Sequence, residues 1–151
     1  MRHPKISVAV LGLPRNAKGQ YLLAMRNDPR NEKAHRKWQI VGGGLELGES
    51  FEDCLLREFA EEIGALPRLL FAYPRIKLQR QPHQQNKELI LACYLVEIDA
   101  NSIECDDREI LEVKWVYPRE ISSFDVLPLT KEFVEECEQI YTRYVLESVL
   151  Q

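Results

Sequence analysis

A short amphipathic helix bracketed by glycines constrains this chain more than any other feature of its sequence. Ser50 is a favourable N-cap, and the acidic residues of the following turn suit the positive end of the helix dipole. Gly64 favours the left-handed conformation that ends a helix. Between them, apolar residues recur at every fourth position and form one stripe that can face a core. They are Phe51, Leu55, Phe59 and Ile63. The pattern predicts a helix over about residues 51–63.

The acidic residues of this helix stand where they destabilise it. Glu58, Glu61 and Glu62 are neighbours on the helix surface, and each like-charged pair costs roughly 0.2–0.5 kcal/mol. Two of them occupy the last turn, where the dipole favours cations and an acid costs about 0.3–1 kcal/mol. A solvated acidic face with Arg57 as local partner is one interpretation. The misplaced acids and the flanking glycines together favour another, a site for a divalent cation and, behind it, a phosphate.

Residues 43–65 resemble the Nudix box of the Nudix hydrolase family. That box is glycine, five residues, glutamate, seven residues, arginine and glutamate, a bulky apolar residue, any residue, two glutamates, any residue, glycine and an apolar residue. The matching positions here are Gly43, Glu49, Arg57, Glu58, Phe59, Glu61, Glu62, Gly64 and Ala65. Phe59 and Ala65 depart mildly from the usual aliphatic residues, and Val41 stands where a proline often precedes the glycines. The resemblance implies a single Nudix domain over residues 1–151. It also implies an α/β (α+β) fold in which a mixed β-sheet is sandwiched between α-helices.

The resemblance also implies roles for the residues of the box. Glu58, Glu61 and Glu62 would hold Mg²⁺ or Mn²⁺, with the carbonyl of Gly43 as an additional ligand. Such a cation neutralises the oxygens of a diphosphate and lowers the pKa of a bound water. Arg57 would orient the glutamates, whereas a mere surface ion pair with Glu61 would be worth little. Glu49 and Glu61 are also among the catalytic residues that the resemblance implies. Glu49 is expected to support the loop or the metal shell more than to act as the catalytic base.

Residues outside the box complete the predicted site. The family often takes a further acid from near a strand that ends in Trp-Val, and Glu109 and Glu112 precede such a pair here. Glu109 is the predicted catalytic acid, although a solvated strand end explains either residue equally well. The predicted substrate-binding residues are Arg26 in the basic loop, Trp38 before the glycines, Gly42 and Gly44. A generic basic surface is the alternative for Arg26, and a core position is the preferred alternative for Trp38.

The rest of the chain reads as strands followed by a second helix. Residues 5–13 and 20–25 are predicted to form a hairpin through the turn at 14–19. Long strands are expected at 68–79 and 88–98, joined by the polar turn at 80–86, and another strand at 110–117. Residues 130–150 have apolar residues at helical spacing and predict a long amphipathic helix.

Composition excludes several classes of protein. The net charge of −4 gives no bulk attraction to nucleic acid or anionic membranes. No apolar run approaches the roughly 20 residues of a membrane span, and the N-terminal apolar run is better explained by a strand than by a signal peptide. Four widely spaced cysteines without a CxxC pair indicate free thiols in a reducing cytoplasm. They are Cys54, Cys93, Cys105 and Cys137.

The expected function follows from the resemblance. It implies a hydrolase that cleaves the diphosphate linkage of a nucleoside diphosphate derivative, and the compact chain favours a nucleoside triphosphate or a related small nucleotide. The alternative is a regulatory Nudix-like domain that binds nucleotides without useful hydrolysis. No stable complex with nucleic acid and no membrane association are expected. A homodimer through the sheet or the C-terminal helix stays open.

Overall fold

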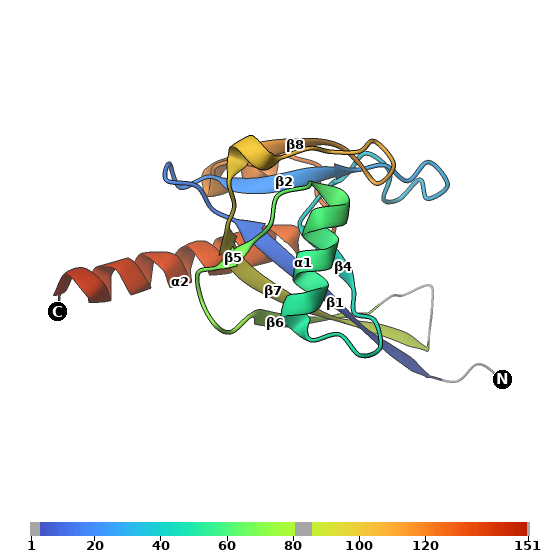
Figure 1. Cartoon of the computed structure of the whole chain (residues 1–151), viewed down its shortest axis with the longest axis horizontal. Helices are drawn as coiled ribbons and strands as arrows, with labels where there is room; N and C mark the ends of the chain where they lie inside the picture. The colour runs from blue at the N-terminus through green and yellow to red at the C-terminus, as the bar shows by residue number, and fades with distance from the viewer. Residues whose placement is uncertain (1–3, 81–85, 151) are drawn as a thin grey trace.

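The computed structural model of the chain describes residues 4–80 and 86–150, which form two sheets and two α-helices (Figure 1). The larger sheet has the strand order β4 (Val41–Gly44), β1 (Lys5–Pro14), β7 (Lys87–Glu97) and β5 (Arg68–Leu69), and β6 (Arg75–Arg80) also pairs with β7. The smaller sheet has the order β3 (Trp38–Gln39), β2 (Tyr21–Arg26) and β8 (Ile110–Val116). The helices are α1 (Phe51–Glu62) and α2 (Thr130–Leu150), and short 3₁₀ turns lie at Ala100–Ser102 and Pro118–Ser123. Because β1 and β7 run parallel while the other paired strands run antiparallel, the larger sheet is mixed.

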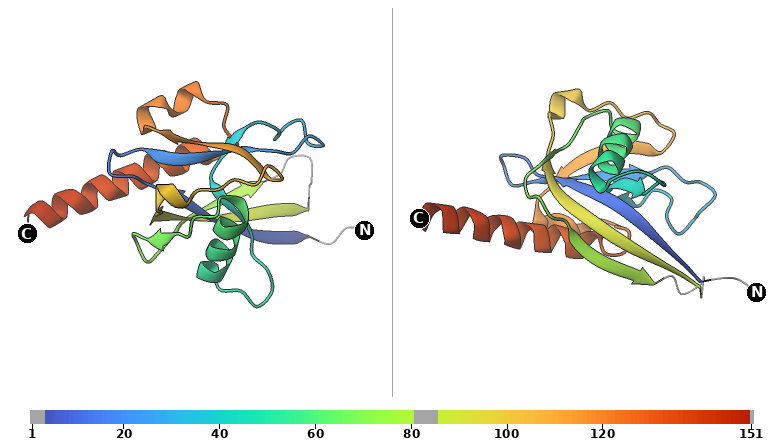
Figure 2. Two further views of the ribbon diagram at one scale, coloured as in Figure 1. Left: turned by 45° about the horizontal axis from the view of Figure 1, so that its top comes forward. Right: turned by 60° about the horizontal axis from the view of Figure 1, so that its bottom comes forward.

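The side chains of the strands are divided between two hydrophobic cores. Successive side chains of a strand point to opposite faces, so neighbouring residues enter different cores. In β2, Leu22 packs into the core that contains Leu55 and Phe59 of α1, whereas Leu23 packs into the core that contains Phe133 of α2. The two helices therefore cover opposite faces of the strands (Figure 2). The predicted arrangement of a mixed sheet between helices is confirmed, with a second, smaller sheet added.

The predicted hairpin of the first two strands is wrong. β1 pairs with β4 on one side and β7 on the other, so both of its edges are occupied. β2 instead joins β3 and β8 in the smaller sheet, and it meets the end of β1 only in an isolated bridge between Arg15 and Tyr21.

The long strand predicted at 68–79 is divided in the structure. It forms β5 and β6, which both pair with β7 and are separated by residues 70–74. Pro74 lacks a backbone N–H and directly precedes β6, which suits the end of this interruption. The polar turn predicted after this strand falls mainly on residues 81–85, outside the described part of the chain.

α1 begins and ends as the sequence predicts. The Ser50 hydroxyl accepts the N–H of Asp53 at 3.0 Å, and the Asp53 carboxylate accepts the N–H of Ser50 at 3.4 Å, which completes a capping box. Gly64 has a left-handed φ of 71° and donates its N–H to the carbonyl of Phe59. These caps fix the register of α1, and with it the faces on which its glutamates lie.

α1 lies unusually close to β1 because the strand offers a glycine there. A Cβ at Gly12 would lie 2.6 Å from Cε1 of Phe59 and 2.9 Å from Cδ1 of Leu55. Gly12 thus sets how deeply the helix sits, and this depth carries the acidic face of α1 toward β4.

α2 has a packed half and a projecting half. Phe133, Val134 and Cys137 are buried, whereas the last turns extend beyond the body of the protein (Figure 1). Within the described residues, neither this helix nor any other is sufficiently long and apolar to cross a membrane.

We expect the substitution Gly12→Ala to lower the free energy of unfolding by roughly 1–3 kcal/mol, because the added methyl overpacks the contact between Phe59 and the sheet. Urea denaturation followed by circular dichroism measures this change. Gly44→Ala is the matched control, since a Cβ at Gly44 meets no heavy atom within 4 Å. Equal stability of the two variants would contradict the assigned role of Gly12.

Candidate metal centre

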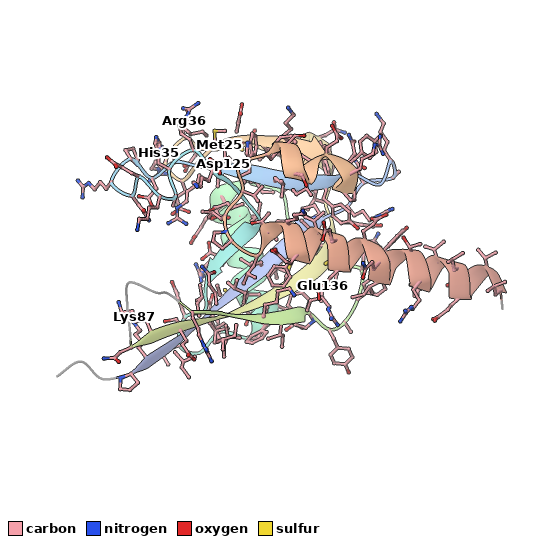
Figure 3. All side chains as sticks on the ribbon, turned by 180° about the vertical axis from the view of Figure 1, so that it is seen from behind. Met25, His35, Arg36, Lys87, Asp125 and Glu136 are labelled. Atoms are coloured by element: carbon pink, nitrogen blue, oxygen red, sulfur yellow. The ribbon has the colours of Figure 1, made fainter. Side chains whose placement is uncertain are left out.

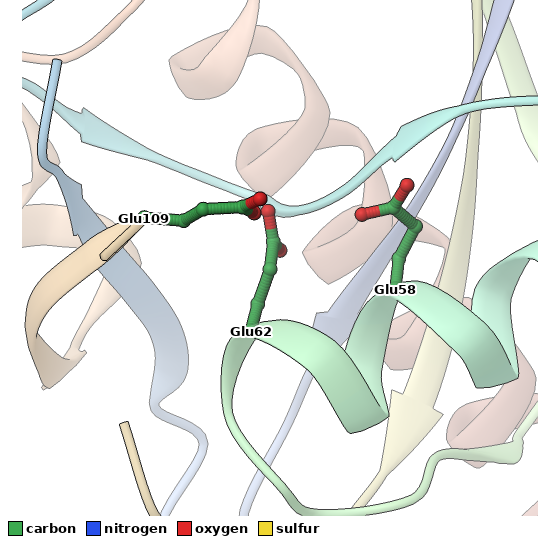
Figure 4. A group of neighbouring side chains, drawn as sticks. All are labelled: Glu58, Glu62 and Glu109. Atoms are coloured by element: carbon green, nitrogen blue, oxygen red, sulfur yellow. The ribbon is translucent and has the colours of Figure 1, made fainter. Parts of the chain in front are cut away.

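Three glutamates from two distant segments meet beside the C-terminal half of α1 (Figure 4). Glu58 and Glu62 come from α1, and Glu109 directly precedes β8. One carboxylate oxygen from each lies within 4.8 Å of the others. Glu58 and Glu62 are buried, whereas Glu109 is exposed. The end of β2 holds Glu109 in place, because the N–H of Asn27 donates to its carbonyl at 2.8 Å.

Burial works against ionisation of these carboxylates. Loss of water raises the pKa of Glu62 to about 8, and the negative charges of Glu58 and Glu109 add to this. The N–H of Gly42, which donates to Oε2 of Glu62 at 3.0 Å, acts in the opposite direction. Burial also raises the pKa of Glu58, although hydrogen bonding from Arg57 opposes the shift. Because ionisation of these carboxylates costs free energy, the group suits a hard divalent cation, which would supply the missing positive charge.

The glycines before α1 allow the backbone of β4 to approach the glutamates. A Cβ at Gly43 would lie 2.5 Å from Oε1 of Glu58, so the carboxylate occupies the space that any other residue would fill. Gly42 has a φ of 145°, and a Cβ there would lie 2.2 Å from the carbonyl oxygen of Val10. The Gly43 carbonyl accepts the thiol of Cys54 at 3.7 Å, and its predicted role as a metal ligand stays a prediction.

Arg57 connects the loop before α1 to the glutamate group. Its Nε and Nη2 donate to the two oxygens of Glu49 at 2.7 and 3.0 Å. Its Nη1 donates to Glu58 at 2.9 Å, and Nη2 also donates to the carbonyl of Gly44 at 2.9 Å. The bond to Glu61 is longer, at 3.4 Å. Arg57 is therefore the centre of a network rather than a simple surface partner of Glu61.

The hydrogen bonds of this network occupy both oxygens of the Glu49 carboxylate. The Arg57 hydrogen bonds, together with the N–H of Glu46 at 2.9 Å, lower the pKa of Glu49 to about 2. Such a carboxylate stays ionised and makes a poor proton acceptor at neutral pH. Its position favours the supporting role that the sequence ranked first.

A cleft of about 520 Å³ opens beside the glutamates. Arg26 lines it, with Nη2 and Nε 3.0 and 3.1 Å from Oδ2 of Asp28 and Nη1 donating to Gln39 at 3.4 Å. The sequence did not predict Asp28 or Gln39. The one signal for Gln39 was a polar residue between the apolar Trp38 and Ile40. The complete lining is Arg26, Asn27, Asp28, Gln39, Gly42, Gly43, Arg57, Glu58, Glu61, Glu62 and Glu109.

The remaining predicted residues lie apart from the three-glutamate group. Glu61 lines the cleft but points further toward solvent, with 53% of its side chain exposed, and Glu109 joins Glu58 and Glu62 instead. Trp38 is buried in the core on the α2 side, with its ring edge-on to Phe124 at 5.8 Å. Its position favours the core alternative. Gly44 does not line the cleft, and its carbonyl holds Arg57.

An apolar pocket of about 210 Å³ adjoins the cleft. Gln39, Gly42 and Gly43 line both spaces, so the two share a border along β3 and β4. The walls of the pocket are mostly aliphatic side chains from β1 and β7, closed by Phe133 of α2, with Gln79 and Thr130 as polar residues. A ligand with a flat apolar part and a charged part could occupy both spaces together.

Comparison with known proteins agrees with this geometry. A family model described as the NUDIX domain matches residues 5–137. The nucleoside triphosphatase NudI of Salmonella typhimurium is 32% identical over 122 residues, which cover 75% of this chain and 84% of the relative. Among solved structures, the MutT protein of Methanosarcina mazei has a TM-score of 0.74 at 23% identity and covers 93% of this chain and 98% of its own. A MutT NUDIX hydrolase of Burkholderia pseudomallei has a TM-score of 0.73 at 16% identity, with 87% and 97% covered.

We expect the stability of the metal-free protein to depend on pH through Glu62. The folded-state pKa of about 8 lies above the ordinary value of 4.5, so the stability contributed by the proton is complete below pH 4.5 and is lost as pH rises toward 8. Relative to wild type, Glu62→Gln should therefore gain roughly 2–4 kcal/mol between pH 5 and pH 9. Urea denaturation in chelator at several pH values measures the difference, and a pH-independent difference would contradict the assignment.

Proposed function

The chain belongs to the Nudix hydrolase family and is a Nudix pyrophosphohydrolase, and we propose that it hydrolyses a nucleoside triphosphate or a related small nucleotide with Mg²⁺ or Mn²⁺ as cofactor. The single observation that carries the proposal is the group of Glu58, Glu62 and Glu109 at the side of a polar cleft. Carboxylate oxygens are the ligands that Mg²⁺ and Mn²⁺ favour. A bound cation would neutralise diphosphate oxygens and lower the pKa of a water.

The residues around the glutamates would orient them for this task. Arg57 fixes the carboxylate of Glu58, and the N–H of Gly42 fixes that of Glu62. Outer partners of this kind hold ligands in the orientation that a metal requires. Glu49 in turn holds Arg57 through two hydrogen bonds. Arg26, which also lines the cleft, would bind phosphate oxygens there, since a planar guanidinium suits their geometry.

Glu61 is the best candidate for the proton acceptor. Among the cleft carboxylates in the described part of the chain, three form the metal group and Asp28 is held by Arg26. Glu61 also lines the cleft, is half-exposed and has only the longer bond to Arg57. We assign it the proton of the attacking water, with Glu49 as a positioning residue.

The two adjoining spaces support a nucleotide as the substrate. The phosphates would lie in the cleft with Arg26 and the glutamates, and the base would lie in the apolar pocket, with Gln39 beside the sugar between them. The relatives named nucleoside triphosphatase support the triphosphate in particular. The four free cysteines support a reducing compartment, and we place the protein in the cytoplasm.

We expect turnover of one or more nucleoside triphosphates in Mg²⁺ and its loss in chelator. The test panel contains the common and deoxynucleoside triphosphates, nucleotide sugars, ADP-ribose and dinucleoside polyphosphates. Chromatography of the products identifies the bond, because cleavage between the α- and β-phosphates gives a monophosphate and pyrophosphate. Chelator-sensitive turnover of another class would overturn the triphosphate assignment alone. Tight nucleotide binding without turnover of any compound would instead favour the regulatory alternative.

Substitutions of two glutamates should have different kinetic effects. Glu62→Gln should raise the Mg²⁺ concentration needed for half-maximal rate by more than about tenfold, because it removes a ligand. Glu61→Gln should lower kcat by roughly 10²–10⁴-fold with little change in Mg²⁺ dependence, because it removes only the base. Glu112→Gln, exposed on β8, is the control for charge. Full activity of both site variants would contradict the proposed centre.

A further inference from the structure

The projecting half of α2 carries apolar side chains that the body of the protein does not cover. Seen from behind, the helix leaves the body beyond Glu136 and extends away from both sheets (Figure 3). Tyr144 still touches the body, with its ring edge-on to Phe71 at 5.2 Å. The other large apolar residues of the last two turns are exposed to solvent. They are Val145, Leu146, Val149 and Leu150.

These four residues form one face of the helix. At about 100° per residue they fall within an arc of roughly 140°, on the side turned away from Tyr144. A helical segment of this length is marginal in water without a packed face. A partner packed on this arc would bury the exposed apolar area and stabilise the helical segment.

The charges beside the arc indicate what that partner is. Arg143 and Glu147 are the only charged residues in 142–150, and they lie together along one border of the arc. Within the described residues neither takes part in an ion pair, and Arg preceding Glu by four residues is the weaker order for pairing within a helix. A partner helix with Glu opposite Arg143 and Arg opposite Glu147 would satisfy both.

A second copy of the same helix meets this requirement in one orientation only. A parallel pair would place Arg143 of each copy level with Arg143 of the other but on opposite borders of the seam, so no opposite charges would meet. An antiparallel pair with its two-fold axis at Val145 places Arg143 of each copy opposite Glu147 of the other, giving two equivalent ion pairs.

The apolar hollow at the root of α2 is not part of this surface. Ile140 lines that hollow, which has a volume of about 340 Å³ and lies between α2 and residues 71–75. At about 100° per residue Ile140 falls on the same side of the helix as Tyr144, away from the arc. The proposed contact therefore involves the exposed arc alone.

We propose that two copies of this chain associate through the C-terminal halves of α2 in this antiparallel register. Two short helices bury less than the roughly 1,200 Å² of a standard interface, so the dimer is weak and reversible. The proposal does not depend on the chemistry of the cleft, since none of the cleft residues belongs to α2. Turnover per chain therefore serves as a check that each variant is folded and intact.

Sedimentation velocity of the full chain over about 5–500 µM tests the proposal. Wild type should shift from monomer toward dimer within this range. Arg143→Glu and Glu147→Arg should each raise the midpoint concentration roughly tenfold, because each replaces two attractions with two repulsions. The double variant with both substitutions should return to within about threefold of wild type. Lys131→Glu, an equal charge change at the other end of α2, should have no effect.

Three results would overturn the proposal. The first is a wild-type monomer at every concentration. The second is a double variant that associates no better than the single ones, which would exclude the antiparallel register. The third is undiminished association of the double variant Leu146→Asp, Leu150→Asp, which would place the interface on another surface, such as the sheet. Circular dichroism of each variant confirms that α2 is still helical.

Discussion

The contact of α1 with the glycines of β1 and β4 is the interaction on which the rest of the site depends. Phe59 rests on Gly12, and the Glu58 carboxylate fills the space beside Gly43. No larger residue at either glycine would permit this depth. The depth removes Glu58 and Glu62 from water while keeping them beside a polar cleft. The hydrophobic packing of one helix face thereby fixes the electrostatics of the carboxylates that border it.

The charges of the site are distributed between two sides with different purposes. On the loop side, Arg57 donates hydrogen bonds to the Glu49 carboxylate, and this pairing lowers the pKa of Glu49. On the inner side, burial raises the pKa of Glu62, and two negative neighbours add to the rise while a single backbone donor opposes it. Stability alone would favour the first kind of pairing throughout. The inner side holds the charge that a bound cation would offset, which is why we propose it as the functional centre.

The sequence predicted the local features well and the long-range ones unevenly. The caps of α1 and the spacing of Glu58 and Glu62 depend on residues close in the chain, and they were predictable from helical geometry. Which strands pair was not, because alternation of apolar residues identifies a strand without naming its partner, and the hairpin prediction failed for this reason. Asp28 and Gln39 belong to the cleft only because the segment after β2 folds back on it. Glu109 was predicted from the family resemblance, yet its place beside Glu62 depends on the pairing of β8 with β2.

The cleft lies where the two sheets meet. Gly42 and Gly43 belong to the larger sheet, on which α1 packs, whereas Arg26 ends β2 of the smaller sheet and Glu109 directly precedes its β8. A cation held by Glu58, Glu62 and Glu109 would therefore also be a cross-link between the two halves of the fold. A change that held the two sheets together more firmly would raise the affinity for the cation, and the bound cation would in turn stabilise the association of the sheets. The activity of this molecule and the cohesion of its fold would therefore depend on the same contact.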